Sequence, residues 1–392
     1  MKKVAFITQR YGNEVLGGAE NFTRWIAEHM SKYWEVTILT TCSKDHVVWD
    51  SFYPPGEDCV NGIRIKRFKL DEARDFDNYN RLTKKMITEE CSPEIQEEWM
   101  RKQGPLSTDL FKYVAKNKGK YDFFVLFGFA WASTYFTISE ISKKSFILPF
   151  AHDEPSLYFD LFENVFDPVA GISFNTPEEK ELVNRVYPKT IKTPSAIISV
   201  GIDIPTKIET GSFLKKYKIT DPYMIYLGRI GPEKGCPELF ANFIRFKQKD
   251  RGGAKLLVLG SGAMPVPRHS DIIYLGPIFG REKFEAIAGC EFLINPSPFE
   301  SFSLILAEAW LLKKPVLVNG KTAVLKGQVL RSNGGLWYET YPEFTEACQI
   351  LFKDKALVKK MGENGKKYVE YNYNWELIEE KYVKFATMLF GS

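Results

Sequence analysis

Short apolar runs alternate with amphipathic helical patterns along the first half of the chain. The runs are rich in β-branched and aromatic residues, and they are Val4–Thr8, Val36–Thr40, Phe123–Phe127 and Phe146–Phe150. The stretch Ala19–Tyr33, between the first two, has the spacing of an amphipathic helix. Strands that alternate with helices in this way are typical of βαβ units. We therefore predict an α/β fold with a parallel sheet.

The segment Thr176-Pro177-Glu178-Glu179 predicts where a further helix begins, since it directly follows the apolar run Ala170–Phe174. Thr176 is a suitable N-cap, Pro177 suits the first helical position, and Glu179 stands where a capping box has its acidic residue. The alternation of strand and helix therefore continues through this part of the chain.

The pattern is interrupted between Gly201 and Tyr223, where a turn-rich sequence and a lysine-rich stretch replace it. It then resumes with the apolar runs Met224–Leu227, Lys255–Leu259, Ile272–Leu275, Phe292–Asn295 and Pro315–Val318. We predict a domain junction there, with an N-terminal domain of residues 1–203 and a C-terminal domain of residues 221–374. Two parallel-sheet domains of similar size favour a cleft in which ligands meet the carboxyl ends of strands from both sides.

The final segment, residues 375–392, predicts a closing helix. Ile378, Tyr382, Phe385 and Leu389 follow one another at helical spacing, so one apolar face is available for packing. We expect this helix to pack back on the N-terminal domain.

Composition narrows the classes of protein that fit. A chain of 392 residues with 44% hydrophobic and 26% charged residues suits two folded domains and excludes a disordered polymer. The formal net charge of +4 is too small for a general nucleic-acid binder. Six cysteines without a Cys-x-x-Cys pair indicate reduced thiols.

No targeting or membrane-spanning segment is apparent in the sequence. Met1–Thr8 starts with charged residues as a signal peptide does, but its apolar run stops at Ile7, so we predict a first strand. No stretch approaches the roughly 20 apolar residues that cross a bilayer. We expect a cytoplasmic protein whose membrane contact, if any, is peripheral and at the inner face.

The strongest chemical signal is the segment Asn295–Leu312. From Ser301 to Leu312 the one charged side chain is Glu308, in a pattern that is apolar nearly all round and therefore predicts a buried helix. A buried carboxylate is costly unless it accepts hydrogen bonds, and a ribose diol would supply them. Glu300 lies on the loop before that helix, where it can address a sugar ring. The alternative is a structural glutamate at 308 and a capping one at 300.

A second signal is the loop Leu227-Gly228-Arg229-Ile230-Gly231-Pro232-Glu233-Lys234-Gly235, which follows a strand. Arg229 offers a planar fork of donors and Lys234 a point charge, a suitable pair for holding a diphosphate without a metal. A solvated surface loop is the alternative.

Two weaker signals lie in the N-terminal half. Gly17 and Gly18 open the first helix directly after the first strand, where bare backbone N–H groups attract phosphate, although glycine pairs also occur in plain turns. His152 stands at the carboxyl end of a strand beside Asp153 and Glu154, where ligands gather, although a lone histidine is often structural.

Two motifs are set aside. Asp75-Phe76-Asp77 imitates a metal-binding Asp-x-Asp, but it lies in a charge run with no strand before it. Gly260-Ser261-Gly262 follows a strand but lacks the third glycine of a dinucleotide site. We therefore expect neither a metal nor a bound cofactor.

In their order and spacing, four motifs resemble the retaining GT-B glycosyltransferases of family 4, the glycosyl transferases group 1. They are Gly17-Gly18-Ala19-Glu20, His152-Asp153, Gly228-Arg229 with Lys234-Gly235, and Pro296-Ser297 with Glu300 and Glu308-Ala309. The resemblance runs from the first strand to about Trp375. It implies two Rossmann-like domains facing a central cleft, with a C-terminal crossing helix. The donor would be a nucleotide sugar, a UDP- or GDP-sugar, held by the C-terminal domain, and the N-terminal domain would hold a saccharide or lipid-linked acceptor.

Roles follow from the resemblance residue by residue. Arg229 and Lys234 would hold the donor diphosphate, Glu300 the sugar hydroxyls and Glu308 the ribose. His152 would face the reacting sugar and, with Glu300, belong to the catalytic set. The Gly17-Gly18 loop would approach diphosphate and acceptor, and the turn that ends at Ile278 would line the base.

The sequence departs from the family at one place. Ser301-Phe302-Ser303 stands where the family often has Gly-Phe-Gly. The backbone of these three residues can still bind the donor, but two added side chains narrow which sugar fits.

The family retains the anomeric configuration, either by a front-face departure or through a covalent intermediate. No carboxylate in the sequence stands out as a nucleophile, so we expect the front-face route, with Arg229 and Lys234 stabilising the leaving diphosphate. The alternatives are a nucleotide-sugar epimerase, a phosphorylase-like enzyme and a catalytically silent sugar-binding partner. We expect a glycosyltransferase of surface polysaccharide or glycoconjugate synthesis.

Overall fold

The computed structural model describes residues 1–15, 17–249 and 252–391. The chain divides into two compact units. Unit 1 consists of Met1–Gly201 with Trp375–Ser392, and unit 2 of Ile202–Asn374. The lysine-rich stretch inside the interruption at Gly201–Tyr223 forms the helix α8 (Thr210–Tyr217), which the sequence did not predict because it buries a single residue, Phe213.

Unit 1 is built on a sheet of eight strands in the order β3-β4-β2-β1-β5-β6-β7-β8. All neighbours pair in parallel except β3 and β4, which are antiparallel. The strands are β1 (Lys2–Ile7), β2 (Trp34–Thr41), β3 (Gly56–Val60), β4 (Ile63–Phe68), β5 (Phe123–Phe127), β6 (Ser145–Leu148), β7 (Gly171–Phe174) and β8 (Ser195–Ile197). The parallel sheet that the apolar runs predict is confirmed.

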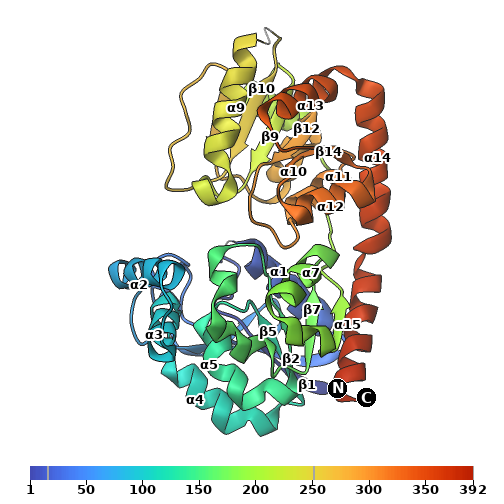
Figure 1. The fold of residues 1–392 in the computed structure, drawn as a ribbon. Helices are drawn as coiled ribbons and strands as arrows, with labels where there is room; N and C mark the ends of the chain where they lie inside the picture. Colours follow the sequence, from blue (N-terminus) through green and yellow to red (C-terminus); the bar gives the residue numbers. More distant parts are fainter. Residues whose placement is uncertain (16, 250–251, 392) are drawn as a thin grey trace. The chain divides into compact units, whose positions relative to one another are not determined.

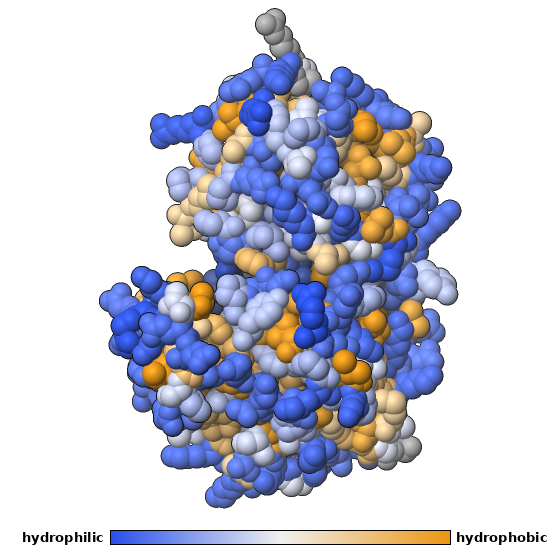
Figure 2. All heavy atoms as spheres, in the orientation of Figure 1, coloured by the Kyte–Doolittle hydropathy of each residue, from blue (hydrophilic) through white to orange (hydrophobic). Residues whose placement is uncertain are grey.

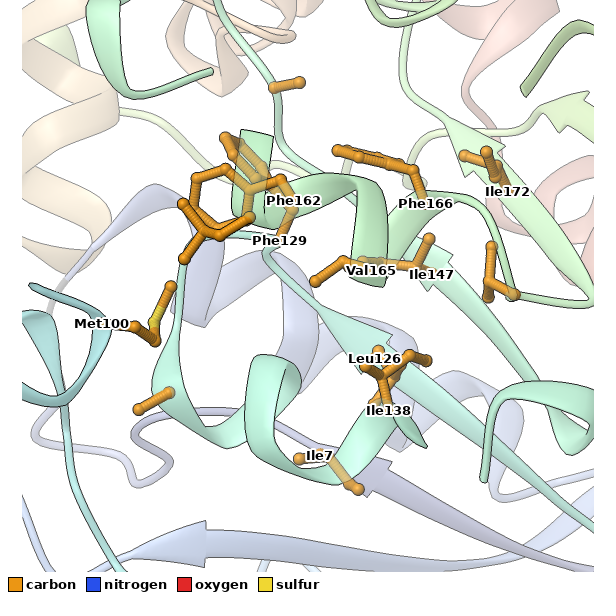
Figure 3. Close-up of a cluster of buried hydrophobic side chains, with 14 of the residues drawn as sticks. Ile7, Met100, Leu126, Phe129, Ile138, Ile147, Phe162, Val165, Phe166 and Ile172 are labelled. Carbon is orange, nitrogen blue, oxygen red and sulfur yellow. The ribbon is translucent and has the colours of Figure 1, made fainter. Parts of the chain in front are cut away.

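Helices cover the sheet of unit 1 (Figure 1). They are α1 (Gly18–Met30), α2 (Phe76–Thr88), α3 (Pro93–Gln103), α4 (Thr108–Asn117), α5 (Ala132–Ile141), α6 (Glu163–Phe166), α7 (Pro177–Val186) and α15 (Trp375–Phe390). Between sheet and helices lies an apolar core, part of which Figure 3 shows. There Leu126 of β5 lies beside Ile138 of α5, and the aromatic rings of Phe129 and Phe162 pack on each other at 4.7 Å. Burial of such side chains is the main favourable term in folding.

The last helix, α15, packs on unit 1. Ile378, Tyr382 and Phe385 are buried, and the Phe385 ring lies 5.5 Å from that of Phe146 on β6. The Tyr382 hydroxyl donates to the Ser199 carbonyl oxygen at 2.8 Å. The apolar stripe in the sequence therefore correctly predicts the buried face of this helix.

Unit 2 has a sheet of six parallel strands in the order β11-β10-β9-β12-β13-β14. The strands are β9 (Tyr223–Leu227), β10 (Lys255–Leu259), β11 (Ile272–Gly276), β12 (Phe292–Asn295), β13 (Val316–Asn319) and β14 (Gly335–Tyr338). The helices, besides α8, are α9 (Cys236–Lys249), α10 (Gly280–Gly289), α11 (Leu304–Leu311), α12 (Ala323–Ser332), α13 (Tyr341–Lys353) and α14 (Lys355–Asn372). Its core is formed by the apolar faces of these strands and helices, such as those of β9 and α9.

Two local features differ from the sequence-based expectations. The strand β6 ends at Leu148 and not at Phe150, because Phe150 has a φ of 52°, which no strand residue adopts. The hairpin of β3 and β4 was missed. Its signal is the pair Asn61-Gly62 between two short runs, with φ values of 51° and 81° that a two-residue hairpin turn requires.

The surface in Figure 2 is mostly hydrophilic, with apolar residues scattered in small groups. All six cysteines are free thiols. Within the described ranges, each helix is too short or too polar to cross a membrane.

Candidate functional site

The strand order of unit 2 reverses direction between β9 and β12. The chain continues from β9 to β10 and β11 on one side, and then returns to β12, β13 and β14 on the other. In open parallel sheets, ligands bind at the carboxyl ends of the strands where the order reverses. The two loops that the sequence singled out, Gly228–Gly235 and Pro296–Ser303, leave these two strands.

The two loops touch at Gly235. This glycine has a φ of 73°, and a Cβ added there would overlap the carbonyl oxygen of Pro296. Both the conformation and the contact exclude any larger residue. The glycine therefore brings the loop after β9 against the loop after β12.

Lys234 and Glu300 form an ion pair across the reversal point. Lys234 Nζ lies 2.9 Å from Glu300 Oε1, and the side chains are 34% and 16% exposed. Arg229 is more open, since its side chain is 46% exposed and its guanidinium lies 4.0 Å from the Glu233 carboxylate. The structure thus joins one predicted diphosphate-binding cation to the predicted sugar-binding carboxylate. The other cation, Arg229, is about half exposed.

The segment 301–303 continues from Glu300 to the start of α11. Ser303 has a φ of 77°, a left-handed conformation that favours glycine, and its hydroxyl accepts a 2.9 Å hydrogen bond from Asn295 Nδ2. The ring of Phe302 is buried and lies 5.0 Å from the ring of Tyr373. A contact of Phe302 with a donor would therefore use its backbone, and Ser301, which is partly exposed, has the more accessible side chain.

Glu308 is buried on α11, as its apolar surroundings in the sequence predict, with 3% exposure. Lys283 on α10 donates to Glu308 Oε1 at 2.6 Å. The second oxygen, Oε2, is buried and accepts no hydrogen bond from the described residues. Sequence reasoning missed Lys283, which is 25 residues away on another helix, and the orphaned oxygen is where a ligand hydroxyl could donate.

Ile278 lies in the loop that follows β11, the edge strand of this sheet, and is partly exposed. Its contribution to a base-binding surface stays a prediction.

In unit 1, His152 follows β6 after a short irregular segment. Its Nδ1 lies 3.5 Å from Glu154 Oε2, and its side chain is 30% exposed. The N–H of Glu154 donates to the His152 carbonyl oxygen at 2.8 Å, which closes a tight turn. The histidine is thus accessible at the carboxyl end of the sheet, as predicted.

Glu179 lies beside this turn. As predicted, Thr176 is the N-cap of α7, and its hydroxyl accepts from the Glu179 N–H at 3.1 Å. The Glu179 carboxylate accepts from the N–H of Ala151 at 2.7 Å and from that of Asn175 at 2.6 Å. Burial raises the pKa of this carboxyl group to about 8, although these backbone hydrogen bonds oppose the rise.

The start of α1 differs from the simple anion site that Gly17 and Gly18 predict. A Cβ added at Gly17 would overlap the carboxylate of Glu20, which is itself buried in an ion pair with Arg10 and accepts from Gln9 Nε2 at 3.0 Å. A carboxylate therefore already lies beside these backbone N–H groups. Phosphate binding at Gly17 and Gly18 stays a prediction.

Metal-ligating side chains do not converge among the residues that the structure describes. Across the described portions of the chain, no three His, Cys, Asp or Glu side chains are grouped so as to hold a metal ion together. Asp75, set aside above, is the N-cap of α2 and accepts from the Asn78 N–H at 3.2 Å.

Comparison with known proteins agrees with the fold. Residues 221–354 match the family model of glycosyl transferases group 1. A sucrose-phosphate synthase from Thermosynechococcus elongatus superimposes with a TM-score of 0.75 at 16% identity, covering 100% of this chain and 99% of that one. Anabaena HepE in complex with UDP-glucose does so with a TM-score of 0.73 at 13% identity, covering 99% and 100%. Two units, each built on a parallel or mainly parallel sheet, together with these full-length superpositions, identify the GT-B fold.

Curated relatives match over shorter stretches. An uncharacterized glycosyltransferase of Methanocaldococcus jannaschii is 25% identical over 244 residues, 56% of this chain and 57% of the relative. The capsular polysaccharide biosynthesis glycosyltransferase CapM of Staphylococcus aureus is 26% identical over 196 residues, 46% of this chain and 51% of the relative. The chain thus spans about half the length of these two relatives.

Proposed function

We propose that this chain is a retaining glycosyltransferase that takes a sugar from a nucleotide-sugar donor, because its residues 221–354 match the family model of glycosyl transferases group 1. The acceptor in this proposal is a saccharide or a lipid-linked saccharide of surface polysaccharide or glycoconjugate synthesis. The capsular function named for the Staphylococcus aureus relative and the UDP-glucose in the Anabaena complex support this choice of substrates.

One observation carries the proposal. The loops after β9 and β12 meet at the reversal point of the sheet in unit 2, where Lys234 pairs with Glu300. A diphosphate would take Lys234 from its partner and free the Glu300 carboxylate to accept hydrogen bonds from sugar hydroxyls. Binding of a diphosphate and of a sugar are therefore coupled through one ion pair, which suits a ligand that contains both.

Glu308 and Arg229 complete the donor site in this proposal. Glu308 Oε2 accepts from a ribose hydroxyl, because it is buried and has no partner within the described chain. Arg229, together with Lys234, stabilises the negative charge that develops on the departing diphosphate, so the reaction needs no metal. The loop residues Ser301, Phe302 and Ser303 contact the sugar and the phosphates mainly through their backbone. His152 of unit 1 acts in the chemical step on the transferred sugar, and unit 1 binds the acceptor.

The test is a screen of the full chain against UDP-glucose, UDP-galactose, UDP-N-acetylglucosamine and GDP-mannose. Thermal shift identifies binding, and sugar release and transfer to added oligosaccharides are then measured side by side. We expect at least one donor to bind and to be hydrolysed or transferred, with the same anomeric configuration in product and donor by NMR. Interconversion of the nucleotide sugar would instead mark an epimerase, and binding without turnover a silent partner.

A matched pair of variants tests the site. Arg229→Ala should lower turnover about 10²–10³-fold, as loss of one transition-state donor does, with little change in melting temperature. Lys359→Ala, at an exposed position on α14, is the control and should leave turnover unchanged. If Arg229→Ala mainly lowers the melting temperature, this loop is structural.

A further inference from the structure

The segment that carries His152 needs an anchor outside its own strand. The strand β6 ends at Leu148, four residues before the histidine, so sheet hydrogen bonds no longer hold the chain there. Phe150 has a φ of 52°, a left-handed conformation that is unfavourable for a bulky residue. Such a conformation persists only where surrounding contacts impose it.

The Phe150 ring packs 5.0 Å from the ring of Phe22, and a further contact, at the next residue, is made by Glu179. One carboxylate oxygen accepts from the N–H of Ala151, the residue between Phe150 and His152, and the other accepts from the N–H of Asn175 before α7. Ala151 and Glu179 are both completely buried. Buried backbone N–H groups are almost always paired, and this carboxyl group pairs one from each of two segments.

Helix capping alone does not explain this arrangement. A capping glutamate accepts from the N–H groups at the start of its own helix, and the bond from the Asn175 N–H is a contact of this kind. Glu179 also reaches a residue 28 positions earlier, in the loop after the neighbouring strand, which a cap does not require. Burying a carboxyl group costs several kcal/mol. The hydrogen bond to the Ala151 N–H can be formed only from this buried position, so we infer that this bond is the reason for the burial.

A second contact from the same helix is too exposed to replace this one. Arg185 of α7 lies 3.4 Å from Asp153, but both side chains are about 60% exposed, and surface ion pairs contribute little. The Tyr158 hydroxyl also donates to Asp153 at 2.6 Å, again at the surface. Glu179 is therefore the hydrogen-bonded attachment nearest to His152 that is buried, since the bond from the Phe129 N–H to the Pro149 carbonyl oxygen lies further back along the segment.

We propose that Glu179 is a positioning residue for His152: by holding the Ala151 N–H, its carboxylate fixes the backbone from which the histidine acts. The proposal rests on the function of His152 proposed above. A carboxyl group suits this position because its two oxygens accept from N–H groups of two different segments. A glutamine can satisfy one of them and presents its own NH₂ group to the other.

The experiment combines a backbone readout with kinetics on the full chain. Hydrogen exchange of peptides within 145–158 is compared in wild type, Glu179→Gln and the control Glu181→Gln, an exposed glutamate on the same helix. Turnover and KM are measured with the donor that gives the fastest hydrolysis among UDP-glucose, UDP-galactose, UDP-N-acetylglucosamine and GDP-mannose. The same variants are made in the His152→Ala background. Circular dichroism checks that each variant folds. If Glu179→Gln does not fold, Glu179→Asp, which keeps the carboxyl group on a shorter side chain, replaces it.

We expect Glu179→Gln to speed exchange in this peptide and to lower kcat about tenfold or more, with the KM for the donor within about twofold of wild type. Glu181→Gln should change neither. In the His152→Ala background, Glu179→Gln should lower kcat no further, because its effect passes through the histidine.

Three results would overturn the proposal. Unchanged exchange in a folded Glu179→Gln variant would show that the carboxylate does not anchor the turn. A wild-type kcat in that variant, or an equal further loss in the His152→Ala background, would show that the anchor does not act through His152. Faster exchange together with full turnover by His152→Ala would instead remove the catalytic role of the histidine, and this result is distinguishable from the other two.

Discussion

Glu308 in unit 2 and Glu179 in unit 1 are both almost completely buried, and both follow the carboxyl end of a parallel strand, yet their partners differ. Glu308 has a lysine on one oxygen and nothing from the described chain on the other. Glu179 has backbone N–H groups on both. Both oxygens of Glu179 accept hydrogen bonds from the backbone, whereas Glu308 retains one oxygen that can accept from a ligand. This contrast separates a group that holds structure from one that is available to a ligand.

The same contrast applies to the surroundings of the two residues. The Lys234–Glu300 ion pair in unit 2 is partly exposed, so a ligand can reach and separate the two side chains. The turn at His152 is instead held by the buried hydrogen bond between Glu179 and the Ala151 N–H. We therefore expect substitutions around the turn in unit 1 to change turnover at constant donor affinity, and substitutions at Glu300 and Glu308 in unit 2 to change donor affinity.

The largest effect is expected for His152→Ala. Loss of one positioned proton-handling group typically lowers turnover about 10²–10⁴-fold, and less if the residue only orients the sugar. The dissociation constant of the donor, measured by calorimetry, should stay near that of wild type because the donor-binding residues are in unit 2. Full activity would make His152 structural, and a large loss of affinity would move it into the donor-binding set.

The next largest effects are expected for two substitutions at the ion pair of Lys283 and Glu308. Lys283→Met leaves the Glu308 carboxylate buried without a cation, which should cost about 2–3 kcal/mol and lower the melting temperature by roughly 4–12 °C. Glu308→Gln removes the buried charge at nearly the same shape, so its melting temperature should change much less. Its affinity for UDP should fall about tenfold or more, because a charged acceptor is lost. A more stable Glu308→Gln variant with unchanged UDP affinity would contradict the ligand role.

The contacts of Glu308 with Lys283 and of Glu179 with Ala151 also show which features could not be predicted from the sequence. The burial of Glu308 was predictable because apolar residues surround it in sequence, and Thr176 was predictable as a cap because caps are local. Lys283 and the Ala151 contact of Glu179 were not, since each partner comes from another element and no spacing rule connects them. The left-handed Ser303 was hidden for another reason, because serine carries no signal for that conformation.

A smaller effect is expected in the pH dependence of stability. The folded-state pKa of Glu179, about 8, lies above its ordinary value of 4.5, so the group stabilises the fold fully below pH 4.5. That contribution is lost as the pH rises through 8, and each pKa unit corresponds to about 1.4 kcal/mol at most. Urea unfolding of wild type and Glu179→Gln between pH 5 and 8.5 should show the wild type losing stability relative to the variant. Carboxylates with lowered pKa values, such as Asp58 and Glu379, act equally in both proteins and cancel. Parallel pH profiles would refute the shift.

The smallest effect, none, is expected from a chelator. In the proposed site Arg229 and Lys234 supply the positive charge that a divalent ion would bring to the diphosphate, and an arginine fork with a lysine is sufficient for that task. Turnover of the best donor in excess EDTA should therefore equal turnover without it, whereas raised salt should slow it, because both cations are partly exposed and screened. The matched control is Arg229→Ala assayed with and without magnesium. Magnesium would restore the turnover of this variant only if a metal ion could replace the arginine, and we expect no such rescue. Complete loss in EDTA that only magnesium or manganese restores in wild type would show that the two side chains do not carry the charge, and that unit 2 binds its donor through an ion.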